Sequence, residues 1–255
     1  MLFASWNVNS LRVRLPQLKD WLAANPADVV ALQETKLPDA DFPRDEIESL
    51  GMRVAFSGQR PYNGVAILAK REIEDVVAGI PGFEDEQKRV LAATIAGVRV
   101  IDLYVPNGQA VGSDKFEYKL RWLEALRGYL AAELERHPLL VALGDYNIAP
   151  EDRDVHDPKA WEGSVHVSEP ERAALRSLLA VGLSDCFRLF EQPEKTYSWW
   201  DYRMMAFRRN AGLRIDLILA SAKLAEKCAE SRIDRSPRRL ERPSDHAPVL
   251  ASFDI

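Results

Sequence analysis

Cysteine is scarce in this chain, with only Cys186 and Cys228 among 255 residues. The two lie far apart, and neither belongs to a CxxC pattern. A disulfide framework or a structural zinc site needs more cysteines at short, regular spacing, so the sequence gives no sign of either. Both cysteines have apolar neighbours, and we expect two buried thiols.

Long apolar runs are also missing. No stretch approaches the roughly 18 uninterrupted apolar residues of a membrane span. The first ten residues, MLFASWNVNS, lack the basic start and the apolar centre of a signal peptide. We therefore expect a cytoplasmic protein with no membrane partner. No oligomerisation signal is visible, which favours a monomer.

An excess of basic residues is absent as well. The chain has 34 Lys and Arg against 39 Asp and Glu, a formal net charge of −5. Nucleic-acid-binding proteins are often basic overall, so the total charge argues mildly against that class. Apolar residues make up 47% and charged residues 29%, which is ordinary for a globular protein. With no linker, low-complexity tract or repeat, we expect one domain over residues 1–255.

The sequence does contain many short apolar runs that stop abruptly at polar residues, a pattern typical of buried strands. They cover residues 2–8, 28–34, 64–69, 90–96, 98–105, 139–147, 213–220 and 248–255. The runs at 90–96 and 98–105 are joined at Gly97 and predict a hairpin. Helical stripes lie between the strands. They predict a helix that starts at Leu15 with Pro16 in its first turn, and others over 115–135, 168–180 and 221–228. Strands and helices in this order predict two packed sheets covered by helices.

Polar residues recur where these apolar runs end, and strand ends converge on one crevice in many sheet proteins. The set comprises Asn7, Asn9, Glu34, Tyr104, Asn107, Asp145, Asn147, Asp216, Asp245 and His246. Several carboxylates without cysteine suit a hard cation, Mg²⁺ or Mn²⁺, rather than zinc. Such a cation, with amide and hydroxyl donors around it, is typical of phosphate chemistry. An aspartate could activate water, and Asp216 could fix the tautomer of His246.

Each of these residues also has a structural explanation. Asn7 and Asn9 could cap the helix that follows, and Glu34 could be a surface residue paired with Lys36. GDYN at 144–147 could be a turn, and His246 could be a loop histidine. Asp216 is harder to explain, because a buried unpaired carboxylate is costly. A purely structural account of the whole set requires every one of these explanations to be correct at the same time, and that coincidence weakens it.

The motifs SWNVNSLR, LQETK, GVAIL, YVPNG, GDYN, SWWDYR, GLRIDLILAS and PSDHAPV occur in this order from residue 5 to residue 249. Together they resemble the exodeoxyribonuclease III family of DNA repair nucleases, within the endonuclease/exonuclease/phosphatase superfamily. The resemblance covers essentially the whole chain. It implies an α/β (α+β) fold, a four-layered α/β sandwich of two packed mixed β-sheets flanked by helices. It also implies Mg²⁺-dependent cleavage of DNA phosphodiesters that leaves 3′-hydroxyl ends, with Mn²⁺ able to substitute.

The resemblance assigns roles to the polar residues. Glu34 matches the main metal ligand, supported by Asn7 and Asn9, with Asp245 close enough to share the ion. Asp145 matches the residue that activates water or protonates the leaving group. Tyr104 and Asn147 match hydrogen-bond donors to the transition state. Asp216 and His246 match an Asp–His pair beside the scissile phosphate, and Asn107 matches a phosphate contact. The implied metal ligands are Asn7, Glu34, Asp145, Asn147, Asp245 and His246.

The resemblance also implies a DNA-binding surface. Trp199 matches an aromatic wall for a base-free sugar, with Leu213 and Ile215 nearby and Trp200 in the core. Basic residues around this aromatic loop predict a local basic rim for duplex DNA. Four lie in the loop itself: Arg203, Arg208, Arg209 and Arg214. Three more follow the ends of the first two strands: Arg12, Arg14 and Lys36.

His166 departs from the family pattern, in which a small residue is common at this place. An imidazole there could obstruct continuous duplex. We therefore expect a bias from internal abasic cleavage towards 3′-terminal work on damaged or recessed DNA ends. Two other functions stay open, a phosphatase or phosphodiesterase for lipid or small phosphates and a catalytically silent DNA-binding module. The sequence does not decide whether Asp145 or His246 handles the key proton.

Overall fold

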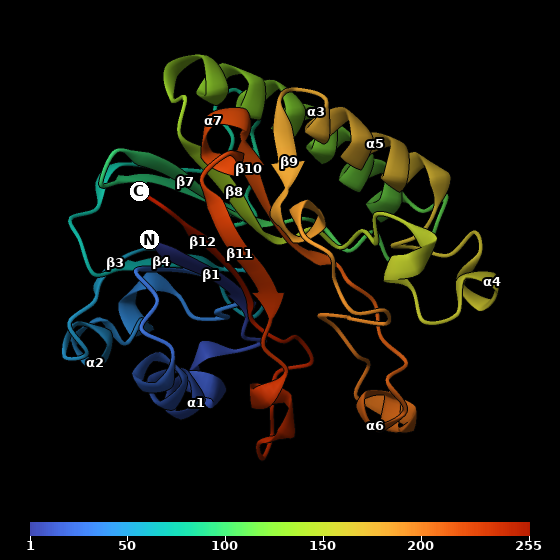
Figure 1. Ribbon diagram of the computed structural model, residues 1–255, viewed down its shortest axis with the longest axis horizontal. Coiled ribbons are helices and arrows are strands. Elements are labelled where there is room, and N and C mark those ends of the chain that lie inside the picture. The colour runs from blue at the N-terminus through green and yellow to red at the C-terminus, as the bar shows by residue number, and fades with distance from the viewer.

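The computed structural model describes residues 1–255 and contains two six-stranded sheets packed face to face. Helices cover the outer side of each sheet, so four layers follow one another from bottom to top in Figure 1. The lowest layer holds α1 (Leu11–Ala24) and α2 (Arg44–Glu48), and the highest holds α3 (Asp114–Arg136) and α5 (Glu169–Leu179). The predicted four-layered α/β sandwich is confirmed.

Each sheet has one parallel pair at its centre and antiparallel pairs around it. The first sheet follows the order β11 (Cys228–Ile233), β12 (Val249–Phe253), β1 (Leu2–Asn7), β2 (Val29–Gln33), β4 (Val65–Ala69) and β3 (Arg53–Ser57). The second follows β5 (Glu74–Ala78), β6 (Val90–Ile95), β7 (Val98–Tyr104), β8 (Leu140–Asp145), β10 (Asp216–Ser221) and β9 (Leu183–Asp185). The parallel pairs are β1 with β2 and β7 with β8, so the carboxyl ends within each pair meet at one edge.

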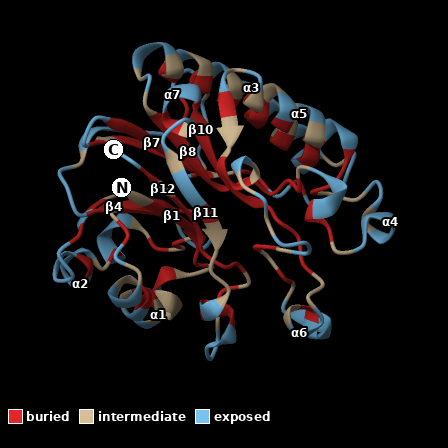
Figure 2. Cartoon of the chain, in the orientation of Figure 1, coloured by how far each residue is buried: buried red, intermediate tan, exposed pale blue.

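Most strands are buried on both faces (Figure 2), which explains why the sequence shows apolar runs rather than alternation. In β8, Val141 and Leu143 pack between the two sheets, whereas Leu140 and Ala142 pack against the helices of the upper layer. The two faces of one strand therefore serve two different cores.

The helix predictions have mixed outcomes. The helices at 115–135 and 168–180 are confirmed as α3 and α5, and the Ser168–Glu171 capping box is present. The first helix begins at Leu11 rather than Leu15, so Pro16 lies inside it. Pro16 has no backbone N–H, so the carbonyl of Arg12 lacks its usual helical hydrogen bond. Arg12 is exposed, so this carbonyl lies on the solvent side of the helix.

The helix predicted over 221–228 is much shorter. α7 spans only Ala222–Ala225, and the Ser221 side chain does not cap it. The hydroxyl of Ser221 instead donates to the carbonyl of Pro138 and accepts from the backbone of Leu140. Two further short helices, α4 (Pro158–Trp161) and α6 (Ala206–Arg209), lie in the loops to the right in Figure 1. None of the helices has the length and apolar composition that spanning a membrane requires.

Gly97 and Gly144 meet two different backbone requirements. Ala96 and Gly97 have φ of 51° and 81°, and two positive values in a row form the tight hairpin predicted between β6 and β7. Gly144 lies within β8 opposite Leu103 of β7, where an added Cβ would overlap the Leu103 carbonyl oxygen. The first half of GDYN is therefore strand, and close strand packing explains its glycine.

Gly144→Ala should lower the free energy of unfolding by about 3 kcal/mol or more, because the methyl group forces β7 and β8 apart. Gly128→Ala is the matched control, since nothing lies within 4 Å of its added Cβ on helix α3. That control should be neutral or stabilising, because alanine is the better helix former. Urea unfolding of both variants measures the difference. Equal stability of the two would contradict the packing explanation.

Candidate active site

The ends of five strands bring the predicted polar residues together at one end of the sandwich. Asn7 ends β1, Glu34 follows β2, Tyr104 ends β7 and Asp145 ends β8. Asp216 begins the antiparallel strand β10 and lies directly opposite Asp145. The loop before β12 adds His246. We call this group the strand-end site, and its members are Asn7, Glu34, Tyr104, Asp145, Asn147, Asp216 and His246.

Asn7 links the two sheets through its side-chain amide. Its Nδ2 donates to Glu34 Oε1 and to Asp145 Oδ2, each at 2.9 Å. The first helix has Ser10 at its N-cap position with no side-chain cap, so neither Asn7 nor Asn9 caps that helix. Asn9 Nδ2 instead donates to Asp245 Oδ1 at 2.9 Å. The capping explanation is therefore wrong for both residues.

Glu34 does pair with Lys36, but this pairing does not remove it from the site. Lys36 Nζ lies 2.8 Å from Glu34 Oε2 and donates to Asn9 Oδ1 at 2.5 Å. The Glu34 side chain is only 17% exposed. The backbone here is strained, because Asn9, Glu34, Lys36 and Asn147 all have positive φ. Strained non-glycine residues cluster at functional sites, where the surrounding structure holds them in place.

His246 lies between two carboxylates. Its Nδ1 is 3.0 Å from both oxygens of Asp216, and its Nε2 is 3.7 Å from Asp145 Oδ2. Burial lowers the pKa of His246, but Asp216 and Asp145 outweigh it and raise that pKa to about 10. Asp216 thus has the buried partner that a carboxylate inside an apolar strand requires, and it fixes the ring orientation.

Asp145 is a buried carboxylate of the strand-end site. Its oxygens accept from Asn7 and from the backbone and side-chain nitrogens of Asn147. Burial raises the pKa of Asp145 to about 7, with the His246 charge acting in the opposite direction. A carboxylate with a pKa near neutrality is suited to accept and return a proton.

The donor set fits a divalent cation. One ligand atom from each of Glu34, Asp145 and His246 lies within 4.8 Å of the others. Two carboxylates dominate this group, which favours a hard cation with oxygen ligands. Asp245 accepts from Asn9 at Oδ1 and from Trp199 Nε1 at Oδ2, the latter at 3.0 Å, and its sharing of the cation stays a prediction. Its contact with Nε1 orients the Trp199 ring.

Asn147 and Asn107 extend the strand-end site towards the loops. Asn147 Nδ2 donates to the backbone of Val105 at 3.0 Å, and Asn107 Nδ2 lies 3.4 Å from Asn147 Oδ1. Arg89, which the sequence reasoning missed, stacks on the Tyr104 ring with its guanidinium 4.5 Å from the ring centre. Burial and the carboxylate of Glu34 raise the pKa of Tyr104, so its hydroxyl is protonated and can donate.

His166 is buried beside these asparagines, with 6% of its surface exposed. Its Nδ1 lies 2.7 Å from the carbonyl of Asn147, so Nδ1 donates and Nε2 faces Asn107 as an acceptor at 3.4 Å. Below it lies Lys119, a fully buried lysine that the sequence reasoning also missed. Its Nζ donates to the carbonyls of Asn107 and Asn147 and to Glu171. Lys119 thus holds both loops of the site against α3 and α5.

His166→Gln should make the protein less sensitive to acid. Burial, with nearby Lys119, lowers the pKa of His166 from 6.5 to about 3. Between these values the unfolded chain binds a proton that the folded chain does not, so stability falls as pH falls through that window. The variant should lose about 2 kcal/mol less between pH 6.5 and about pH 5. Urea unfolding at the two pH values measures this, and an unchanged pH dependence would contradict it.

Trp199 forms the wall of a second part of the site. It lines a cavity of about 700 Å³ together with Arg203 and with Trp161 of α4, whose ring meets it edge-on at 6.4 Å. Leu213 and Ile215 are completely buried behind Trp199, so they support the ring and do not form the exposed wall. Trp200 is fully buried, as predicted.

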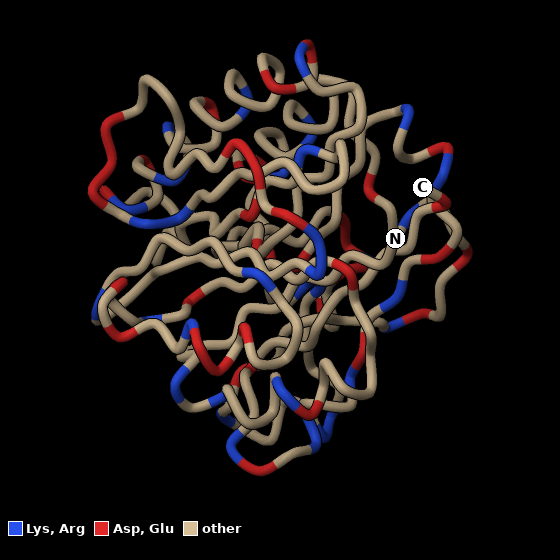
Figure 3. The backbone as a smooth tube through the Cα atoms, turned by 90° about the vertical axis from the view of Figure 1, so that its left-hand side faces the viewer, with Lys and Arg blue, Asp and Glu red and all other residues tan.

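The predicted basic rim needs correction. Arg214 is buried and bonded to Asp154 and Asp185, so it is a structural residue. Arg14 donates to three oxygens, two of them backbone carbonyls, and stabilises the loop before β12. Arg203 is exposed but paired with Asp201. Figure 3 shows basic and acidic residues intermixed along the loops rather than gathered on one face.

Comparison with known proteins identifies the class to which this fold and site belong. Residues 4–246 match the model of the Endonuclease/Exonuclease/phosphatase family. The chain therefore belongs to that family. It is 38% identical to exodeoxyribonuclease III of Haemophilus influenzae over 99% of this chain and 100% of that protein.

Solved structures narrow the assignment. A 3′ phosphatase from Neisseria, NExo, solved with a product DNA hairpin, superimposes with a TM-score of 0.98 at 47% identity and full coverage of both chains. An AP endonuclease from Archaeoglobus fulgidus gives 0.97 at 40% identity, again with full coverage of both chains. Within the larger family, the chain belongs to the exodeoxyribonuclease III family of DNA repair nucleases, and it is a hydrolytic nuclease of that type.

Proposed function

We propose that this protein is a Mg²⁺-dependent DNA repair nuclease that restores 3′-hydroxyl ends on duplex DNA, acting chiefly at damaged or recessed 3′ ends. The convergence of Glu34, Asp145 and His246 within 4.8 Å carries the proposal, because it provides a cation site beside a buried Asp–His pair. One domain over residues 1–255, a monomeric state, a cytoplasmic location and a supporting role for Mn²⁺ remain predictions from the sequence.

The strand-end residues divide the chemistry among them. Glu34 and Asp145 would hold a divalent cation, which would supply charge stabilisation for the phosphoryl oxygens. Asp145, with its raised pKa, accepts the proton of the attacking water or protonates the leaving group. His246, oriented by Asp216, donates to a phosphate oxygen. Asn147 and Tyr104 donate to the charge that develops in the transition state.

The neighbouring residues position the DNA. Asn9 and Asn107 present amides at the edge of the strand-end site and contact phosphates. The Trp199 ring, supported from behind by Leu213 and Ile215, packs against a sugar that has no base. Arg203 lies 85% exposed on the same cavity and meets the DNA backbone from the loop that carries α6.

His166→Gly should raise the ratio of internal abasic cleavage to 3′-terminal activity. The buried imidazole is held between Asn107 and the Asn147 backbone, so its removal frees Asn107 at the edge of the strand-end site. Its φ of 77° favours glycine, so the substitution relieves backbone strain. We expect the ratio to rise about tenfold or more, which corresponds to a change of about 1.4 kcal/mol or more in the relative activation free energy.

The ratio is measured with labelled duplexes that carry an internal abasic site or a 3′ phosphate. His137→Ser, at the other end of the sandwich, is the control and should leave both activities unchanged. An unchanged ratio in His166→Gly would remove the role of His166 in substrate choice.

The proposed function is tested by comparing three labelled duplexes in Mg²⁺, with an internal abasic site, a recessed 3′-hydroxyl and a 3′ phosphate. We expect the two 3′-terminal substrates to be processed fastest. Substrate binding should weaken steeply with salt, because phosphate contacts release counterions. A folded protein that processes none of the three would contradict the proposal and favour a lipid or small-phosphate substrate or a catalytically silent DNA-binding module.

A further inference from the structure

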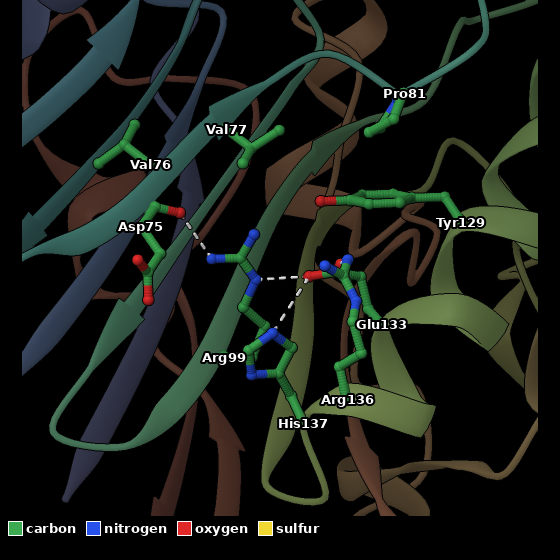
Figure 4. Close-up of a pocket in the computed structure, with 9 residues that line it drawn as sticks. All are labelled: Asp75, Val76, Val77, Pro81, Arg99, Tyr129, Glu133, Arg136 and His137. Carbon is green, nitrogen blue, oxygen red and sulfur yellow. Dashed lines mark hydrogen bonds and ion pairs between the residues drawn. The ribbon is translucent and has the colours of Figure 1, made fainter.

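A second polar cavity lies far from the strand-end site. It has a volume of about 610 Å³ and opens between the edge strand β5 and the last turns of α3 (Figure 4). Arg99, near the start of β7, lies at its centre, and Tyr104 at the other end of β7 belongs to the strand-end site. Five residue steps along the strand place the two roughly 16 Å apart, so the sites are distinct. We call it the Arg99 cavity.

The Arg99 guanidinium is fixed by contacts on two sides. Its Nε donates to Glu133 Oε2 at 2.5 Å, and both side chains are buried. One of its Nη atoms donates to the backbone carbonyl of Asp75 at 2.8 Å. Asp75 has a φ of 49° at an irregularity of β5, which turns this carbonyl inwards. The guanidinium is thus held in one orientation before any ligand arrives.

Two arginines, Arg99 and Arg136, and two carboxylates, Glu133 and Asp75, line the Arg99 cavity. Arg99 and Arg136 both pair with Glu133, so two cations meet one buried carboxylate. The carboxylate of Asp75 belongs to an exposed residue at the rim. The ring of His137 lies 3.9 Å from Glu133. Burial, Arg99 and Arg136 lower the pKa of His137, so its ring is neutral near pH 7 and adds no charge there.

Tyr129 supplies an unused donor. Only 7% of the surface of this residue is exposed, and its hydroxyl finds no hydrogen-bond acceptor. Burial raises the pKa of Tyr129, so the hydroxyl stays protonated. In Figure 4 the Tyr129 hydroxyl and the free edge of the Arg99 guanidinium point into the same space. A buried donor without an acceptor costs about 1–3 kcal/mol, which a ligand oxygen would recover.

We propose that the Arg99 cavity binds a small oxyanion, a carboxylate or a phosphate, with one oxygen accepting from Tyr129 and Arg99 together. Arg136 closes over the anion from the exposed side, where 64% of its side chain is accessible. This site does not depend on the nuclease chemistry, since none of its residues belongs to the strand-end site.

The test uses the full chain in EDTA, which removes metal-dependent phosphate binding at the strand-end site. Sodium acetate and inorganic phosphate are titrated separately, and the ring signals of the histidines are followed by NMR. At least one anion should shift the His137 ring signals saturably and raise the pKa of that ring. The other three histidines lie outside the Arg99 cavity and should not respond in the same way. The absence of a saturable His137 response to either anion would overturn the proposal.

Tyr129→Phe separates binding from folding. It removes only an unpaired hydroxyl, so the protein should fold normally and hydrolyse DNA at the wild-type rate. The dissociation constant for the bound anion should rise at least about fivefold. Tyr118→Phe on the same helix is the matched control, because its hydroxyl contacts Asp85 outside the cavity. Equal anion affinity in both variants would also overturn the proposal, and the choice between acetate and phosphate identifies the chemical source.

Discussion

Asp145→Asn is expected to lower kcat by about 10³-fold while the protein stays folded. The substitution removes the one carboxylate that belongs both to the cation group and to the pair with His246. General acid–base catalysis contributes about 10²–10⁴-fold, and loss of a cation ligand adds to that effect. The asparagine keeps one oxygen for the hydrogen bonds that Asn7 and Asn147 donate.

The free energy of unfolding of Asp145→Asn should not fall as kcat does. Burial raises the pKa of Asp145, so the ionised carboxylate destabilises the folded state, and its neutral replacement should not. We expect the unfolding free energy in EDTA to stay the same or to rise. Asp20→Asn, at an exposed position on the first helix, is the control for both measurements. A variant with near wild-type kcat would show that Asp145 is not part of the machinery.

Glu34→Gln should weaken binding of a divalent cation by about 100-fold, because one negative ligand is lost. The glutamine still offers an oxygen to Asn7, and Lys36 keeps its contact with Asn9, so the local structure should persist. Hydrolysis should fall by a similar factor at fixed Mg²⁺. Part of the rate should return at high Mg²⁺, since the Asp145 carboxylate remains.

Cation binding can be measured without activity. Mn²⁺ binding, followed by the loss of its free-ion paramagnetic resonance signal, gives the dissociation constant directly. Glu72→Gln removes an exposed carboxylate paired with Arg53 and should leave that constant unchanged. An unchanged constant in Glu34→Gln would exclude Glu34 as a ligand, whatever happens to the rate.

The predictability of each strand depended on its place in the sheet. Strands with neighbours on both sides, such as β1, β2 and β8, are buried on both faces and were predicted as apolar runs. The four strands that the sequence reasoning missed, β3, β5, β9 and β11, all form sheet edges. These edge strands are partly exposed, so their composition does not distinguish them from loops.

Burial also decides which residues of the site could be predicted from the sequence. The polar residues that end apolar strands stood out, because nothing in a buried strand explains them. Lys119 was missed although it falls on the apolar stripe of α3 between Phe116 and Trp122, a position that signals a buried charge. Arg214 was misassigned to the basic rim, because its partners Asp154 and Asp185 are distant in sequence.

One measurement tests the central claim, that the strand-end site is a metal-dependent hydrolytic centre for DNA. A duplex with a labelled 3′ phosphate is incubated with the wild-type protein in Mg²⁺ and, separately, in EDTA. We predict release of phosphate in Mg²⁺ and none in EDTA, with activity restored when Mg²⁺ is added back. Equal release in both conditions would contradict the account, because Glu34, Asp145 and His246 would then act without the cation that their arrangement fits.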